Sequence, residues 1–147
     1  MNAKFDLTGK VAIVTGGGRG IGRSVSLGLA QSGASVVVAS RTPKEVEGVA
    51  EEIKKMGGKA LAIVTDLTVN DQLENLVNAA VKEFGRIDIL VNNAARSFLR
   101  SLLDLREDGW DKVFNTNRHS GESRNPESHE NPGFRVALRP EHHAVQG

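Results

Sequence analysis

Four short apolar runs, rich in alanine and β-branched residues, recur along the first part of the chain. They cover residues 11–14, 35–39, 60–64 and 87–91. Most positions in each run are apolar, instead of every second one, which is typical of strands that are covered on both faces, as in a parallel sheet. The rest of the chain must therefore supply helices for both faces of that sheet.

The segments between these runs have helical spacing of their apolar residues. Helices are predicted over residues 20–31, 46–53 and 73–84, and glycine follows each of them within a few residues. A further helix is predicted over residues 106–117. Strands that alternate with helices at this spacing indicate βαβ units with right-handed crossovers, and hence an α/β fold with a parallel sheet.

The composition changes sharply after residue 117. Residues 118–147 hold all four histidines and three of the four prolines of the chain, but no lysine or aspartate, and only six of their residues are apolar. So few apolar side chains cannot offset the entropy cost of ordering the segment. We therefore expect residues 1–117 to fold and residues 118–147 to form an unstructured tail.

Several classes of site and partner are excluded by composition. The chain has no cysteine, which excludes disulfides, thiolate metal sites and cysteine nucleophiles. Its 147 residues carry a formal net charge of +1, which favours neither nucleic acid nor an anionic membrane as partner. We find no secretory signal and no stretch near the roughly 18 apolar residues of a membrane span. A cytoplasmic protein without a metal site is expected.

A glycine-rich loop joins the first predicted strand to the first predicted helix. Glycine permits a tight turn, and the N-terminus of the helix offers N–H groups and a positive dipole end to a pyrophosphate. The alternative is a glycine-rich turn without a ligand, but its place in a βαβ unit favours dinucleotide binding. The residues expected to form this cofactor loop are Thr15, Gly16, Gly18, Arg19, Gly20, Ile21 and Gly22.

The second predicted strand is followed by Ser40 and Arg41. An acidic residue at this position would bind the adenosine ribose hydroxyls, whereas a basic residue suits a 2′-phosphate. Arg41 and Arg19 are therefore expected to bracket that phosphate, which favours NADP over NAD as cofactor. The alternative is that both are ordinary solvated arginines.

With these motifs, residues 7–117 resemble the N-terminal part of the short-chain dehydrogenase/reductase family. Asp66, which stands in the sequence Thr65-Asp66-Leu67, is similar to the family aspartate that contacts the adenine ring, and Asn92-Asn93-Ala94-Ala95 is similar to the family's Asn-Asn-Ala-Gly signature beside the cofactor. Asn117, seven residues after Trp110, resembles the asparagine of the catalytic tetrad. The resemblance thus implies cofactor contacts for Asp66, Leu67, Asn92, Asn93 and Ala94 and a catalytic role for Asn117. Taken singly, the aspartate and the asparagines could instead cap turns or helix ends.

The resemblance also shows which family features these 147 residues lack. Family members use a tyrosine as general acid, a lysine four residues later and a serine from the fifth strand. This chain contains no tyrosine, and its last lysine is Lys112. In the family, further strands and the dimer-forming helices would follow the position of residue 117. In this chain, residues 118–147 follow instead, and they look like read-through or frameshifted sequence.

The expected fold is an incomplete Rossmann-type, doubly wound parallel sheet of about four strands in the order 3-2-1-4, with residues 87–91 as an unpaired edge. The expected function is that of an NAD(P)-dependent oxidoreductase for carbonyl compounds or secondary alcohols. The general acid is missing, so the chain alone is expected to be inactive. The alternatives are a nucleotide-binding module without turnover and a nonfunctional gene fragment.

Overall fold

Parallel β-strands form the centre of the protein. The structure, a computed structural model, describes residues 5–95 and 135–138 of the chain. The sheet order is β3-β2-β1-β4-β5, and the first four of these strands run parallel. This confirms the predicted order 3-2-1-4. The strands are β1 (Val11–Thr15), β2 (Ser35–Ser40), β3 (Ala60–Val64), β4 (Ile89–Asn92) and β5 (Arg135–Leu138).

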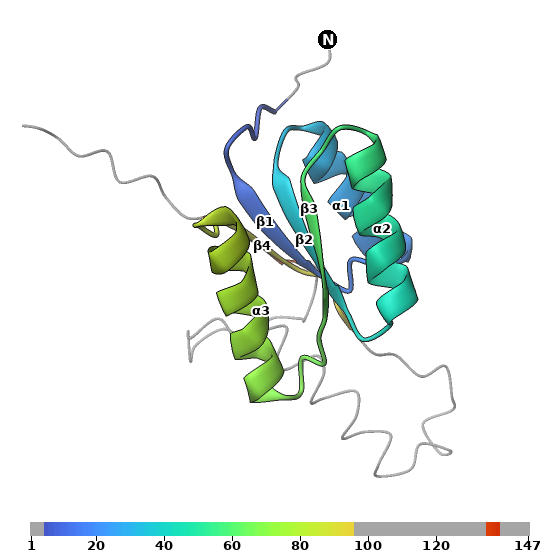
Figure 1. Cartoon of the computed structure of the whole chain (residues 1–147), viewed down its shortest axis with the longest axis vertical. Helices are drawn as coiled ribbons and strands as arrows, with labels where there is room; N and C mark the ends of the chain where they lie inside the picture. The colour runs from blue at the N-terminus through green and yellow to red at the C-terminus, as the bar shows by residue number, and fades with distance from the viewer. Residues whose placement is uncertain (1–4, 96–134, 139–147) are drawn as a thin grey trace, which may run out of the picture.

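Within residues 5–95, three helices cover the two faces of this sheet. α1 (Gly20–Gln31) and α2 (Pro43–Lys55) lie on one face, and α3 (Asn70–Phe84) lies on the other (Figure 1). α1 has the predicted bounds, whereas α2 and α3 begin three residues earlier than their apolar patterns. No helix in residues 5–95 is long and apolar enough to cross a membrane.

Neighbouring residues of each central strand pack on opposite faces of the sheet. Val14 and Val36 belong to a buried cluster that includes Ile53 of α2. Val37 belongs to a second cluster, with Leu76 of α3. Since both faces are covered, both sets of side chains must be apolar, and this is why the strands appear in the sequence as continuous apolar runs.

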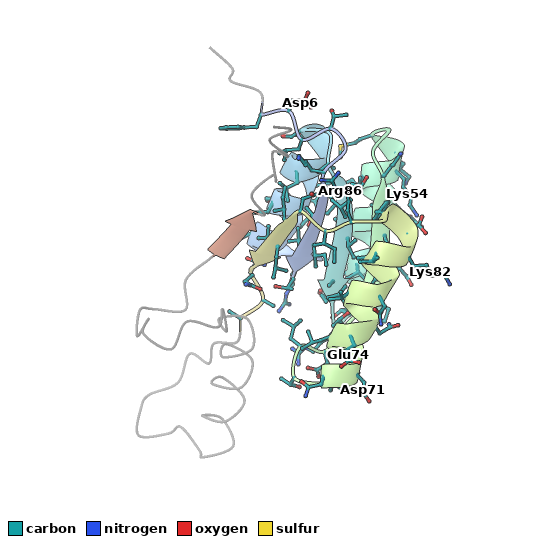
Figure 2. The ribbon with its side chains drawn as sticks, turned by 90° about the vertical axis from the view of Figure 1, so that its left-hand side faces the viewer. Asp6, Lys54, Asp71, Glu74, Lys82 and Arg86 are labelled. Carbon is teal, nitrogen blue, oxygen red and sulfur yellow. The ribbon has the colours of Figure 1, made fainter. Side chains whose placement is uncertain are left out.

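The sequence pattern overstates the buried face of α3. Leu76 and Ala80 are buried, as the helical spacing predicts. Val77 and Val81 belong to the same pattern, but their exposed fractions are 46% and 45%. The charged residues labelled on the outer side of this helix, Asp71 among them, project away from the sheet (Figure 2).

The fifth strand departs from the sequence-based expectation. β5 pairs antiparallel with β4, so that Ile89 lies opposite Leu138 and Asn92 opposite Arg135; Figure 2 shows it as the arrow beside β4. The prediction that residues 118–147 lack regular structure does not hold for these four residues, and β4 is not the edge of the sheet. A count of apolar residues misses such a strand, because unpaired N–H and C=O groups of an edge can recruit a short extended segment through the backbone.

Asp88 connects the start of β4 to the start of β1. Its carboxylate accepts hydrogen bonds from the backbone N–H of Val11 at 2.9 Å and from Arg86 Nη2 at 2.6 Å. Burial raises the pKa of Asp88, but the hydrogen bonds from Arg86 and Val11 and the charges of Arg86 and Lys10 outweigh it, so that the pKa is lowered overall. The ionised carboxylate therefore stabilises the fold.

Replacing Asp88 by alanine should lower the free energy of unfolding by about 2 kcal/mol at neutral pH, because it leaves a strand N–H and a guanidinium without their charged acceptor. A lowered pKa in the folded state means that this contribution is complete above the unfolded value, about 3.9, and is lost as pH falls through the folded value. Urea unfolding at neutral and acidic pH measures both effects. Glu74→Ala on the exposed side of α3 is the control, expected within about 0.5 kcal/mol of the parent. Equal stability of Asp88→Ala and parent at neutral pH would contradict the prediction.

Candidate functional site

A cavity of about 540 Å³ lies at the carboxyl ends of the parallel strands. All four parallel strands or the segments that follow them contribute to its wall, because the carboxyl ends of parallel strands meet at one edge of the sheet. The lining residues are Gly16, Arg19, Ala39, Ser40, Arg41, Thr42, Glu45, Thr65, Asp66, Leu67, Thr68, Asn93, Ala94 and Ala95.

Most of the residues singled out in the sequence meet at this cavity. Those in its lining are Gly16, Arg19, Ser40, Arg41, Asp66, Leu67, Asn93 and Ala94. The others in the described part of the chain lie in the same segments but are not part of the lining: Thr15, Gly18, Gly20, Ile21, Gly22 and Asn92. Asn117, predicted as a catalytic residue, lies outside the described residues.

The glycine loop turns back on the first turn of α1. Gly16 has a φ of +64° and Gly20 a φ of +53°, the left-handed region that favours glycine. A Cβ on Gly22 would overlap the carbonyl oxygen of Gly16 and would lie 2.5 Å from Asn93 Nδ2. The loop therefore requires glycine at position 22 because the backbone of the loop and the helix touch there.

Asn93 and Thr15 hold the loop against the end of β4. The Asn93 side-chain amide donates hydrogen bonds to the carbonyl oxygens of Thr15 and Gly16, both at 3.2 Å. The Thr15 hydroxyl donates to the carbonyl oxygen of Val91 at 3.2 Å and accepts a bond from the Asn93 N–H at 3.1 Å. These contacts fix the loop before any ligand binds.

The N-terminus of α1 faces this region without a capping side chain. Its N-cap residue, Arg19, makes no side-chain cap hydrogen bond, and the first turn contains no acidic residue. An uncapped helix N-terminus with a glycine-rich approach suits an anionic group such as a phosphate, which the dipole and the free N–H groups stabilise.

Two arginines on the cavity wall differ from the two other arginines in residues 5–95. Arg23 forms an ion pair with Glu52 at 2.7 Å, and Arg86 pairs with Asp88. Arg19 and Arg41 line the cavity, and neither guanidinium has a hydrogen bond or ion pair to any residue in 5–95 or 135–138. The cavity thus carries two guanidinium groups that are available to an anion.

Asp66 has a turn-forming role in addition to its place in the cavity wall. Its Oδ1 accepts hydrogen bonds from the N–H of Thr68 at 2.9 Å and from the Thr68 hydroxyl at 2.7 Å. Asp66 therefore caps a turn, as the alternative interpretation of this aspartate predicted. It does not exclude a ligand contact, since the same residue lines the cavity.

Sequence reasoning missed several polar residues of the cavity, namely Thr42, Glu45, Thr65 and Thr68. Their positions provide a signal that could have found them, because each follows a predicted strand by one to six residues and parallel strands end at the same edge. Glu45 is the least expected, since it places a carboxylate in the first turn of α2 on the same wall as the arginines.

The family model described as short chain dehydrogenase matches residues 10–121. The chain belongs to this family. Its members are oxidoreductases that bind nicotinamide dinucleotides, and the match includes every residue that we predicted to contact the cofactor. The matched region extends four residues beyond residue 117, the end predicted for the folded part.

Two of the proteins to which this chain is similar are fungal reductases. This chain is 40% identical over 135 residues to hydroxynaphthalene reductase arp2 of Aspergillus fumigatus, covering 90% of this chain and 50% of that one. It is 43% identical over 112 residues to the hydroxynaphthalene reductase-like protein Arp2 of Metarhizium robertsii, covering 76% of this chain and 42% of that one. The chain thus spans about half the length of these relatives, and the first alignment reaches into residues 118–147.

A solved structure shows the same fold. A short-chain type dehydrogenase/reductase from Mycobacterium marinum superposes with a TM-score of 0.76 at 39% identity, covering 80% of this chain and 47% of that one. The predicted Rossmann-type sheet is therefore confirmed for the parallel part of the fold.

Proposed function

We propose that this short-chain dehydrogenase chain is the NADP(H)-binding half of an oxidoreductase that transfers hydride between the cofactor and a carbonyl compound or secondary alcohol. The observation that carries the proposal is the cavity, where an uncapped helix N-terminus and two unpaired guanidinium groups meet. The fungal relatives are named reductases, which favours reduction as the direction of the reaction.

The residues of the cavity fit the parts of a dinucleotide. We assign the pyrophosphate to the glycine loop and the first turn of α1. A Cβ at Gly16 would lie 3.0 Å from Ala94, and glycine there keeps the backbone of the loop open to a ligand, which supports the assignment. Asp66 and Leu67 are assigned to the adenine. Asn92, Asn93 and Ala94 are assigned to the half of the cofactor that carries the nicotinamide. When bound, the nicotinamide supplies or accepts the hydride.

The proposed choice of NADP over NAD depends on Arg19 and Arg41. Each guanidinium lines the cavity and lacks a described protein partner, so that a 2′-phosphate can accept hydrogen bonds from both. Ser40 adds a hydroxyl on the same wall. The carboxylate of Glu45 would repel the phosphate and so opposes this preference. The two positive charges of Arg19 and Arg41 still outnumber its single negative charge.

The test is the preference between the two cofactors. The unmodified chain should bind NADPH about 10- to 100-fold more tightly than NADH at low salt, the range expected from a hydrogen bond to a charged group. Arg41→Asp should reverse the order, because its carboxylate repels the phosphate and accepts bonds from the ribose hydroxyls. Isothermal titration with both cofactors measures this ratio.

Salt and an arginine outside the cavity lining provide the controls. High salt should reduce the NADPH preference, since it screens a partly exposed charge pair. Arg23→Gln removes an arginine that pairs with Glu52 and is not part of the cavity lining, adds no carboxylate near Arg19, and should leave the ratio between the cofactors unchanged. Equal affinities for NADPH and NADH in the unmodified chain at low salt would refute the arginine pair as the basis of the choice.

A further inference from the structure

The hydroxyl of Thr65 is the one buried side-chain polar atom in the described residues that has no hydrogen-bond partner. Thr65 follows the last residue of β3, is 1% exposed and lines the cavity. Its backbone is held in place, because its N–H donates to the carbonyl oxygen of Ser40 at 2.8 Å. The side chain thus sits on a fixed backbone at the wall of the site, with its hydrogen-bonding capacity unused.

The fold satisfies the other buried hydroxyl groups among the described residues. Thr15 is 4% exposed and bonds to Val91 and Asn93. Ser26 is fully buried, and its hydroxyl donates to the carbonyl oxygen of Gly22 at 2.9 Å. Buried polar groups in folded proteins are nearly always paired, and an unpaired one costs more than a typical hydrogen bond contributes. The exception at Thr65 lies at a ligand cavity, which points to a partner that arrives with the ligand.

We infer that the Thr65 hydroxyl is a binding group for the adenosine half of the dinucleotide and makes in the complex a hydrogen bond that it lacks in the free protein. The inference rests on the proposed function, which places the adenosine between the ends of β2 and β3. Rotation about χ1 redirects a threonine hydroxyl without any backbone movement. The hydroxyl can both donate and accept a bond, as the edge of adenine requires, directly or through one bound water.

The experiment compares Thr65→Val with the parent chain, using adenosine 2′,5′-bisphosphate as the probe because it contains the adenosine half without the nicotinamide. Valine keeps the shape of threonine and removes the hydroxyl. Thr65→Val should bind the probe about 2- to 10-fold more weakly in calorimetric titration, the effect of one neutral hydrogen bond. Without ligand, its melting temperature should equal or exceed that of the parent, since the variant removes an unpaired buried group.

Two further variants separate this role from a structural one. Thr65→Ser keeps a hydroxyl and should bind close to the parent value. Thr8→Val makes the same substitution at an exposed site whose hydroxyl bonds to Asp6, and should leave affinity for the probe unchanged. The loss in Thr65→Val should also be independent of salt, because no charged group of the protein is removed.

The outcomes distinguish this inference from the function on which it rests. If the parent chain binds neither NADPH nor the probe, the proposed function fails and this inference fails with it. If the parent binds and Thr65→Val binds equally well, the inference alone is overturned. A melting temperature of Thr65→Val several degrees below that of the parent would also overturn it, because the hydroxyl would then be satisfied in the free protein.

Discussion

Incubated with NADPH and a panel of aldehydes and ketones, the purified 147-residue chain should oxidise the cofactor no faster than the uncatalysed background. Reduction of a carbonyl by hydride requires a proton donor at the carbonyl oxygen. The family uses a tyrosine for this purpose, and the chain contains none. Loss of a general acid alone lowers the rate by about 10²- to 10⁴-fold. Substrate positioning by the family's serine is lost in addition.

The loss of NADPH absorbance over time measures this activity. A reductase from the expression host is the main source of error, and the cofactor-binding variant Gly22→Ala, purified identically, is the control for it. Activity that is equal in both preparations comes from a contaminant. Turnover of roughly 1 to 10³ per second in the parent chain, absent from the Gly22→Ala preparation, would contradict the prediction and require another proton donor.

Gly22→Ala itself should abolish NADPH binding and lower the free energy of unfolding by about 1–3 kcal/mol, the range for an overpacked site. The added Cβ would overlap the carbonyl oxygen of Gly16 and crowd the Asn93 amide. Both belong to the contacts that hold the glycine loop against β4. The loop must move to make room, and the N–H groups that it presents to the pyrophosphate move with it.

Gly28→Ala provides a matched control within the same helix. Gly28 lies in α1, and a Cβ there would have no heavy atom within 4 Å. This variant should therefore bind NADPH normally and gain about 0.5–1 kcal/mol in stability, because alanine loses less backbone entropy than glycine in a helix. Urea unfolding and calorimetric titration measure both variants. If Gly22→Ala behaves like Gly28→Ala, the close contact of loop and helix is not needed for the site.

The parallel core of this protein could be predicted from its sequence because its signals are local. A strand covered on both faces needs apolar side chains at consecutive positions. Residues 35–39 and 60–64 can therefore be recognised as strands without knowing which strands lie beside them in the sheet. α2 likewise shows its buried face in the spacing of Val46, Val49, Ala50 and Ile53, all of which are buried. The order of the strands required more than local pattern and came from the family resemblance.

The candidate site was predicted in part for the same reason. The glycine loop and Arg41 stand directly after strands, and the carboxyl ends of parallel strands converge whatever the details of packing. Glu45 and Thr65 also follow predicted strands, which is a signal that could have found them, but what distinguishes each of them depends on tertiary distances. Glu45 reaches the wall only through the position of α2. Thr65 stands out only because its hydroxyl lacks a partner, which no sequence pattern reveals.

The sequence by itself determined the four parallel strands, the helices between them and the glycine loop, since each follows from the conformational preferences and burial of residues close together in the chain. Only the tertiary structure decided what lies beside β4. The pairing of Val91 with Val136 joins residues 45 positions apart, and the partner comes from a segment whose composition predicts no structure at all. An edge strand accepts a partner through its backbone N–H and C=O groups, which every residue except proline carries in full. Side-chain composition therefore contains no signal for which segment pairs with β4. The geometry of the folded sheet determines that partner.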